Sequence, residues 1–289
     1  MSKEISLDEI KKIWPEKAPD INIVQKYVSK YEKEKIVIKY GGNVLIDRKV
    51  FDNFISDIDL LNKLGLSIIV VHGGGPRIKR ELDEKNITSK FINGLRVTDK
   101  NIINIVENVL IDFNKDIVSS LEKLGSKANS FHTKNDNVIE VEPEREELGF
   151  VGIPRKINAN LIKDALNKNK IPIIAPLGLD KNNQTFNING DTAASAIAKK
   201  LKARRLILMT NVEGVYDDKK NLISEIKPLD LDNLIKWKIV KGGMIPKIEN
   251  CVDAVENGVR GVVILDGRKP HSILHEIFLD MGSGTLIRK

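Results

Sequence analysis

The sequence predicts an α/β fold built on a largely parallel, helix-covered sheet. Short β-rich runs, most of them flanked by glycine, recur along the chain: KIVIKYGG, SIIVVHGGG, PIIAPLG, RLILMTN and GVVILDG. Amphipathic helical patterns separate these runs, and strand-helix alternation favours parallel pairing with helices on the faces of the sheet. With 289 residues, of which 41% are hydrophobic, the chain is long enough to enclose a full core.

Ahead of the first core strand, the chain predicts an N-terminal helix. Val24, Tyr27, Val28 and Tyr31 lie at offsets of 0, 3, 4 and 7, and Asp20 is placed to cap that helix. An apolar stripe on a terminal helix needs a covering surface. Two coverings remain open, the helix's own domain or a neighbouring subunit.

Two later helices show the same spacing and are predicted to face the core. Their apolar positions are Phe51, Phe54, Ile55 and Ile58 in one, and Ala194, Ile197, Ala198 and Leu201 in the other. Between residues 136 and 152, the short alternating runs NVIEVEPE and LGFVG predict a hairpin outside the main sheet, at a lid or lobe junction. No repeat or flexible Gly/Ser linker appears, so two lobes are expected to share one continuous sheet.

Composition narrows the class of protein. With 30% charged residues and a mean hydropathy of −0.21, the sequence lacks an apolar run as long as a membrane span requires, roughly 18 residues or more. Cys251 is the single cysteine, which excludes an intrachain disulfide and a Cys-rich metal cluster and suits a reducing cytoplasm, the expected location. The net charge of +7 is dispersed and only 5% of residues are aromatic, so no nucleic-acid partner is expected.

Two glycine turns are the first candidates for a phosphate site. Gly41-Gly42-Asn43 and Gly73-Gly74-Gly75 each follow a strand and lead towards a helix. Glycine lets backbone N–H groups approach an anion closely, and a helix N-terminus adds positive potential. Neither turn is a P-loop or a dinucleotide fingerprint, and a Gly-Gly turn by itself is more often a plain turn than a site.

Charged side chains near these turns suit phosphoryl transfer. Lys39 beside the first turn and Lys247 in GGMIPKIENC are candidates to neutralise a transferring phosphoryl group. Asp191 begins a helical stripe, where the helix dipole favours a carboxylate. Arg96 in NGLRVTD offers a planar fork that suits a carboxylate. Read singly, each has an ordinary explanation: a surface lysine, a helix cap or a surface ion pair.

Together these segments resemble the acetylglutamate kinases of the amino-acid kinase family. VIKYGGN, VVHGGGPRI, NGLRVTD, NINGDTAA, LMTNVEGVYDD and GGMIPKI occur in the family's order and cover nearly the whole chain. The resemblance implies a three-layer αβα sandwich with a mainly parallel open central sheet. It divides the chain into an N-terminal helical extension (1–33), an N-lobe that binds acetylglutamate (34–179) and a C-lobe that binds MgATP (180–289).

The resemblance also implies a reaction and its residues. ATP would phosphorylate the side-chain carboxylate of N-acetyl-L-glutamate, a step of arginine biosynthesis, with Mg²⁺ held mainly by the nucleotide phosphates. By similarity, Lys39 and Lys247 stabilise the transferring group and Asp191 orients both lysines. The implied phosphate and substrate set is Gly42, Gly73, Gly74, Gly75, Arg96 and Asn187, and the nucleotide set is Thr210, Asn211, Val212, Gly214, Val215, Tyr216, Met244 and Lys247. Gly190 stands where many relatives carry alanine, with little consequence expected.

The N-terminal helix and the run HSILHEIFLDMGSGTLI resemble the arginine-inhibited, hexameric branch of the family. By analogy, an arginine pocket would form near Tyr27, His271, Glu276 and Gly282. The N-terminal helices would join dimers into a ring, a trimer of dimers. L-arginine is therefore the expected inhibitor.

Two other classes remain open. A sister kinase, such as glutamate 5-kinase, carbamate kinase or aspartokinase, would phosphorylate another acceptor, although NGLRVTD is similar to the acetylglutamate kinases specifically. A non-catalytic sensor on the same fold would not need both phosphoryl-facing lysines. A γ-carboxylate, with a pKa of roughly 4.3, is already ionised at neutral pH and needs no general base, and none is apparent in the motifs.

Overall fold

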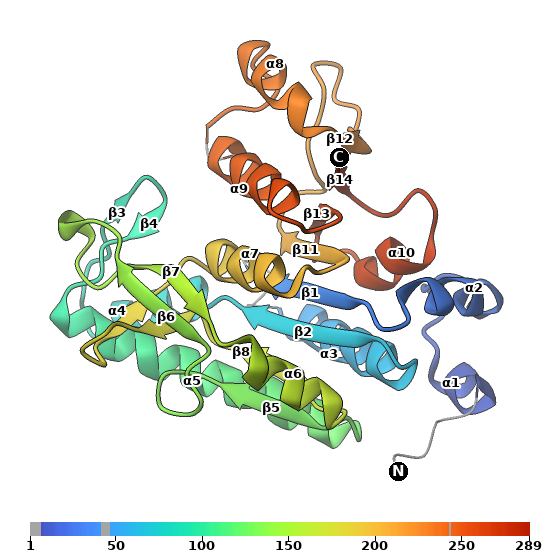
Figure 1. Ribbon diagram of the computed structural model, residues 1–289, viewed down its shortest axis with the longest axis horizontal. Coiled ribbons are helices and arrows are strands. Elements are labelled where there is room, and N and C mark those ends of the chain that lie inside the picture. The colour runs from blue at the N-terminus through green and yellow to red at the C-terminus, as the bar shows by residue number, and fades with distance from the viewer. Residues whose placement is uncertain (1–6, 42–46, 243) are drawn as a thin grey trace.

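The chain folds as a central sheet between two layers of helices (Figure 1). The structure, a computed structural model, describes residues 7–41, 47–242 and 244–289. Its main sheet has eight strands in the order β12-β14-β13-β11-β1-β2-β8-β5. The strands are β1 (Lys35–Tyr40), β2 (Ser67–His72), β5 (Ala128–Phe131), β8 (Ile171–Ile174), β11 (Arg205–Thr210), β12 (Glu225–Ile226), β13 (Val262–Asp266) and β14 (Thr285–Ile287). Neighbours pair in parallel except β13 and β14, which confirms the predicted α/β fold with a mainly parallel sheet.

Helices cover both faces because successive side chains of each strand point to opposite sides. In β1, Val37 belongs to one apolar core and Ile36 and Ile38 to the other. One core is completed by α6 (Ala159–Asn167), α7 (Gly190–Leu201) and α9 (Met244–Glu256). The other is completed by α2 (Ile21–Tyr31), α3 (Arg48–Lys63), α5 (Lys100–Lys123) and α10 (Ser272–Phe278). The apolar stripes predicted on α3 and α7 are buried, which confirms them.

A smaller sheet lies beside the main one. Its order is β10-β9-β6-β7, formed by β6 (Ile139–Pro143), β7 (Gly152–Ile157), β9 (Leu177–Leu179) and β10 (Thr185–Asn187). β6 and β7 are antiparallel, which confirms the predicted hairpin outside the main sheet. The boundary predicted after residue 179 lies between antiparallel β9 and β10, so backbone hydrogen bonds cross it. Strands from both sides of that boundary join the main sheet, and the division into lobes stays a prediction.

The remaining elements connect these layers. They are α1 (Leu7–Ile13), α4 (Gly75–Glu84), the hairpin of β3 (Phe91–Ile92) and β4 (Leu95–Arg96), α8 (Leu231–Lys236), and the short 3₁₀ turns η2 (Glu146–Leu148) and η3 (Pro228–Asp230). Of the helices that the structure describes, none is both long and apolar enough to cross a lipid bilayer.

The N-terminal helix packs on its own chain. Asp20 caps α2 as predicted, its side chain accepting a hydrogen bond from Asn22 N at 2.9 Å. Val24, Tyr27 and Tyr31 are buried against α10, which lies next to α2 in Figure 1. This chain's own α10 therefore covers three of the four stripe residues, and Val28 is partly buried.

Candidate active site

Two neighbouring strands bring their glycine turns to one edge of the main sheet. β1 ends just before Gly41 and β2 just before Gly73, and the two strands pair in parallel. The carboxyl ends of strands are where open α/β sheets bind ligands. A cleft of about 350 Å³ lies there, a size typical of small-molecule sites. From the predicted site it gathers Lys39, Gly73, Gly74, Gly75, Arg96 and Asn187. Gly42 lies outside the described residues.

Lys39, Asp191 and Lys247 form one ion-pair cluster. Along β1, Lys39 shares the face of Val37, which α7 and α9 cover. Asp191 lies in the first turn of α7 and Lys247 in the first turn of α9. Lys39 Nζ lies 3.0 Å from Asp191 Oδ1, and Lys247 Nζ donates to Asp191 Oδ2. The side chains of Lys39, Asp191 and Lys247 are 12%, 17% and 19% exposed, so the cluster is largely shielded from water.

The two ammonium groups keep Asp191 ionised. Burial alone would raise the pKa of Asp191, but the charges of Lys39 and Lys247 outweigh burial and hold that pKa well below its usual range. Asn189 caps α7 by accepting hydrogen bonds from Asp191 N at 2.9 Å and Thr192 N at 3.1 Å. The helix dipole therefore also favours the carboxylate. Such a carboxylate pairs with both lysines and is too weakly basic to act as a general base.

The glycine turn after β2 presents backbone donors to the cleft. Gly73 N donates to Tyr40 O at 2.6 Å, which ties this turn to the end of β1. α4 begins at Gly75 with Gly74 as its N-cap, and the first N–H groups of a helix have no partner within it. A Cβ added at Gly75 would meet nothing within 4 Å. Gly75 therefore faces open space, as an anion site at a helix N-terminus requires.

Arg96 is held in the cleft by the β3–β4 hairpin. Asn93 and Gly94, with φ of 49° and 81°, form its turn, and this residue pair is typical of two-residue hairpins. Arg96 is 9% exposed, donates to Gly75 O at 3.3 Å, and has its guanidinium 4.8 Å from the centre of the Phe91 ring. These contacts pre-orient a fork that suits a carboxylate.

Asn187 reaches the same cleft from the end of β10. Its backbone N donates to Phe150 O at 2.9 Å, and its side chain lies 3.5 Å from Thr98 Oγ1. The buried Thr98 in turn donates to Arg96 O at 2.9 Å. Two predicted substrate residues that are far apart in the sequence are thus connected through Thr98.

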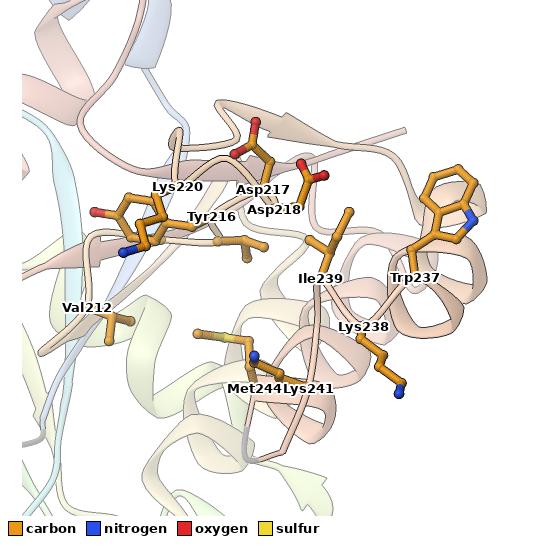
Figure 2. Close-up of a pocket in the computed structure, with 12 residues that line it drawn as sticks. Val212, Tyr216, Asp217, Asp218, Lys220, Trp237, Lys238, Ile239, Lys241 and Met244 are labelled. Carbon is orange, nitrogen blue, oxygen red and sulfur yellow. The ribbon is translucent and has the colours of Figure 1, made fainter.

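A second pocket, of about 440 Å³, lies between segment 212–220 on one side and residues 237–241 and Met244 on the other (Figure 2). Its lining includes five predicted nucleotide residues: Val212, Gly214, Val215, Tyr216 and Met244. Thr210 and Asn211 lie just before this lining in the chain, at the end of β11.

Sequence reasoning missed the second side of the pocket, which includes Trp237, Lys238, Ile239 and Lys241. Trp237 between Lys236 and Lys238 in the sequence was a usable signal, because an aromatic ring and ammonium groups suit a nucleotide's base and phosphates.

The ion-pair cluster has residues close to both pockets. Lys39 lines the first, and Lys247 lies one turn along α9 from Met244 of the second. Two cations and one anion leave a net positive charge at the junction, which favours passage of an anionic group between the pockets. Among the residues that the structure describes, no group of three or more His, Cys, Asp and Glu side chains is placed to hold a metal ion.

A third pocket, of about 210 Å³, lies near α2 and α10. Its lining includes Glu276 and Gly282 of the predicted arginine set, together with Lys30, Tyr31 and Asp280. Tyr27 lies alongside, where its hydrogen bond with Asp280 raises the pKa of the Tyr27 hydroxyl. His271 is not brought into this lining. His271 is the N-cap residue of α10, with a left-handed φ of 56°. Its Nδ1 lies 2.6 Å from Asp57 Oδ1 on α3, and both residues line another, smaller pocket.

Comparison with known proteins places this fold and site in a family. Residues 34–266 match the amino acid kinase family. The chain is 54% identical over 98% of its length to an acetylglutamate kinase of Pelagibacter ubique, of which it covers 98%, and 46% identical over 95% to that of Clostridioides difficile, of which it covers 98%. A solved N-acetylglutamate synthase from Neisseria gonorrhoeae has a TM-score of 0.84 at 22% identity over 94% of this chain and 64% of its own, a likeness of fold alone. The chain therefore belongs to the amino acid kinase family, as one of its acetylglutamate kinases.

Proposed function

We propose that this enzyme transfers the γ-phosphoryl group of ATP to the side-chain carboxylate of N-acetyl-L-glutamate, forming N-acetyl-L-glutamyl 5-phosphate and ADP in the cytoplasm. The observation that carries the proposal is the Lys39–Asp191–Lys247 cluster between two pockets. The cleft at the glycine turns takes the acceptor, and the pocket on segments 212–220 and 237–244 takes the nucleotide. In the proposed division, the N-lobe of residues 34–179 provides most of the acceptor cleft, residues 187–190 complete it, and the C-lobe of residues 180–289 provides the nucleotide pocket.

The transfer requires positioning and neutralisation of charge more than acid-base chemistry. A carboxylate oxygen of the acceptor forms a bond to the γ-phosphorus while the bond to the β,γ-bridging oxygen breaks, and ADP leaves with that electron pair. The acceptor is already ionised, so no proton has to be removed. Lys39 and Lys247 neutralise charge on the transferring oxygens, and Asp191 keeps their ammonium groups in place.

Magnesium, in this proposal, arrives with the nucleotide. Asp191, the carboxylate of the cluster, is already engaged by two lysines, which leaves it a poor metal ligand. The described residues of the site form no cage of acidic, histidine or cysteine side chains for the ion, and the nucleotide phosphates would hold it.

The test is ADP release from the purified protein with MgATP and, in parallel, N-acetyl-L-glutamate, L-glutamate, carbamate or L-aspartate. We expect activity with N-acetyl-L-glutamate alone. Activity with another acceptor would instead identify a sister kinase, and tight nucleotide binding without turnover on any acceptor would identify a sensor.

Arg96→Lys is expected to raise the KM for N-acetyl-L-glutamate about tenfold, with the KM for ATP nearly unchanged. Lysine keeps the charge but loses the fork that Gly75 O and the Phe91 ring hold in place. Steady-state kinetics with each substrate varied in turn checks this. An equal rise in both KM values would contradict a role in acceptor binding.

Gly41→Ala is expected to lower kcat about tenfold, because small misplacements of a catalytic group are costly. A Cβ at Gly41 would lie 2.2 Å from Lys39 Nζ, so the ammonium group would have to move. The matched comparison is Gly190→Ala, whose Cβ would meet Lys39 Cε at 3.2 Å, a contact that a small movement relieves. We expect kcat to change less than about twofold in Gly190→Ala. Equal losses in the two variants would contradict this reading of Lys39.

The third pocket is proposed to bind L-arginine as a feedback inhibitor. Glu276 is a partly buried carboxylate that accepts a hydrogen bond from Ser283 N at 2.9 Å, and the loss of hydration raises the pKa of Glu276. The charge of Arg205 already acts on Glu276 in the opposite direction, and a guanidinium or ammonium group of a ligand would be a second cationic partner for this carboxylate. We also propose that the enzyme forms a hexamer, a trimer of dimers. Since this chain's own α10 covers the apolar stripe of α2, the subunits would join through other faces, where Ile13 and Ile23 are exposed.

Glu276→Gln is expected to raise the arginine concentration for half-inhibition about tenfold or more, because glutamine keeps the shape and loses the charge. Inhibition is measured relative to each variant's own uninhibited rate, with the surface variant Glu140→Gln as control. Light scattering gives the oligomeric state. Dimers only, together with no inhibition of the unmodified enzyme by millimolar arginine, would reject this part of the proposal.

A further inference from the structure

A buried histidine adjoins the glycine turn of the acceptor cleft. His72 is the last residue of β2, is fully buried, and directly precedes Gly73. Its ring meets that of Phe113 edge-on, with centroids 5.1 Å apart. The proposed transfer uses no general base, so this polar ring in an apolar layer needs another explanation.

The hydrogen bonds of the ring fix which nitrogen carries the proton. His72 Nδ1 lies 2.9 Å from Gly73 O, and a carbonyl oxygen can only accept, so Nδ1 donates. Nε2 is then an acceptor, and Asn114 Nδ2 donates to it at 3.2 Å. The imidazole is thus used at both ends, as buried polar groups generally are.

Both the amide nitrogen and the amide oxygen of the Asn114 side chain make further hydrogen bonds. Its other Nδ2 hydrogen goes to Ile173 O on β8 at 3.0 Å, and its Oδ1 accepts from Ser130 Oγ on β5 at 2.6 Å. A continuous chain of donors therefore runs from Ser130 through Asn114 and His72 to the carbonyl of Gly73. It joins two strands and α5 to the glycine turn.

This series of hydrogen bonds ends at one peptide group, the one between Gly73 and Gly74, and holds its orientation. In a trans peptide the C=O and the following N–H point in opposite directions. With the Gly73 carbonyl directed to the buried His72, the N–H of Gly74 points away from the interior, and Gly74 lines the cleft. A Gly-Gly peptide has an unusually free backbone. If this peptide flipped, a carbonyl oxygen would face the cleft in place of a donor and repel an anion.

The imidazole stays neutral under physiological conditions. Burial lowers the pKa of His72 to about 4, and the nearby Arg77 and His132 act in the same direction. Nε2 is consequently free to accept from Asn114 near neutral pH, and the donor chain persists.

We propose that His72, held by Asn114, is a positioning residue that fixes the Gly73–Gly74 peptide so that the Gly74 N–H faces the acceptor carboxylate. The inference rests on the proposed function only for the identity of that acceptor. His72 acts through Gly74 and touches no reacting atom.

Two variants of His72 each keep a polar group near only one of the two ring nitrogens, and so test the two hydrogen bonds separately. The shorter side chain introduced by His72→Asn places an amide near the position of Nδ1, where it can donate to Gly73 O. His72→Gln instead places its amide near Nε2, towards Asn114. We expect kcat/KM for N-acetyl-L-glutamate to fall on the order of tenfold in His72→Gln, less than the loss of a direct transition-state donor. In His72→Asn, we expect kcat/KM for N-acetyl-L-glutamate to stay within about twofold of the value for the unmodified enzyme. The KM for ATP should be nearly unchanged in both variants. Equal losses in the two variants, or a parallel rise in the KM for ATP, would overturn the proposal.

The tautomer provides a test that needs no variant and no activity. ¹⁵N NMR of the unmodified protein is expected to show His72 protonated at Nδ1 and bare at Nε2, and the reverse pattern would overturn the proposal even if both variants fail to fold. Failure of the proposed function would look different, since the unmodified enzyme would then not turn over N-acetyl-L-glutamate while the tautomer remained as expected.

Discussion

Lys39→Met is expected to lower kcat about 10³-fold while the KM values for both substrates change less than about threefold. Methionine keeps much of the volume of the lysine stem but removes the ammonium group that lies 3.0 Å from Asp191 Oδ1 and lines the acceptor cleft. The lost contact is one that strengthens as charge moves onto the transferring oxygens, so its absence raises the barrier more than it weakens binding.

Lys247→Met should show the same pattern from the nucleotide side of the cluster. Steady-state and single-turnover kinetics measure both variants, with Lys156→Met as the matched control, because Lys156 pairs with Glu140 on the exposed surface. The double variant should lose less than the product of the two single losses, since the lysines share Asp191. A rise in KM with kcat unchanged would mean that the lysines only bind substrate.

Asp191→Asn is expected to lower kcat by about 10² to 10³-fold, because asparagine leaves two ammonium groups facing each other without the carboxylate that orients them. The fold should lose about 1–3 kcal/mol, less than the loss for a fully buried pair because the side chains retain some exposure. Urea unfolding of both proteins near neutral pH measures this difference. Unchanged kcat with lowered stability would restrict Asp191 to a structural role.

The stability difference should shrink in acid. The pKa of Asp191 is lowered in the folded state, so its contribution is fully present above the unfolded value of about 3.9 and is lost as the pH falls from there towards the folded value. Between neutral pH and about pH 3 the gap between the two proteins should narrow by about 1 kcal/mol. A constant gap would show that Asp191 is not held ionised by its partners.

Much of the fold was predictable because its signals are local. The periodicity of Phe51, Phe54, Ile55 and Ile58 reports a helix face within a few turns, and the glycine runs after β1 and β2 mark strand ends in the same way. The β3–β4 hairpin was not predicted, although its Asn93-Gly94 turn is a strong local signal. The hairpin hydrogen bonds across the predicted lobe boundary at 179 were also missed, because the β9 and β10 runs are only three residues each.

The site was predictable only in part. Lys39, Arg96, Asn187, Asp191 and Lys247 were singled out one motif at a time, and the structure brings them to the same cleft and its adjoining ion-pair cluster. Trp237 and Ile239 belong to none of the motifs that resemble the family, and their place in the second pocket depends on where residues 237–241 and Met244 lie relative to segment 212–220. His271, expected near an arginine pocket, has its Nδ1 2.6 Å from Asp57 Oδ1 on α3 and does not line the third pocket.

The sequence by itself determined the type and order of the elements and the chemical character of the site, since periodicity, glycine turns and residue types are properties of short stretches of chain. Only the tertiary structure decided that Asp191 lies between Lys39 and Lys247, that Thr98 connects Arg96 with Asn187, and that His72 holds the Gly73 carbonyl. The physical reason is that these contacts join residues on different elements, whose separation is set by strand order and helix packing rather than by distance along the chain.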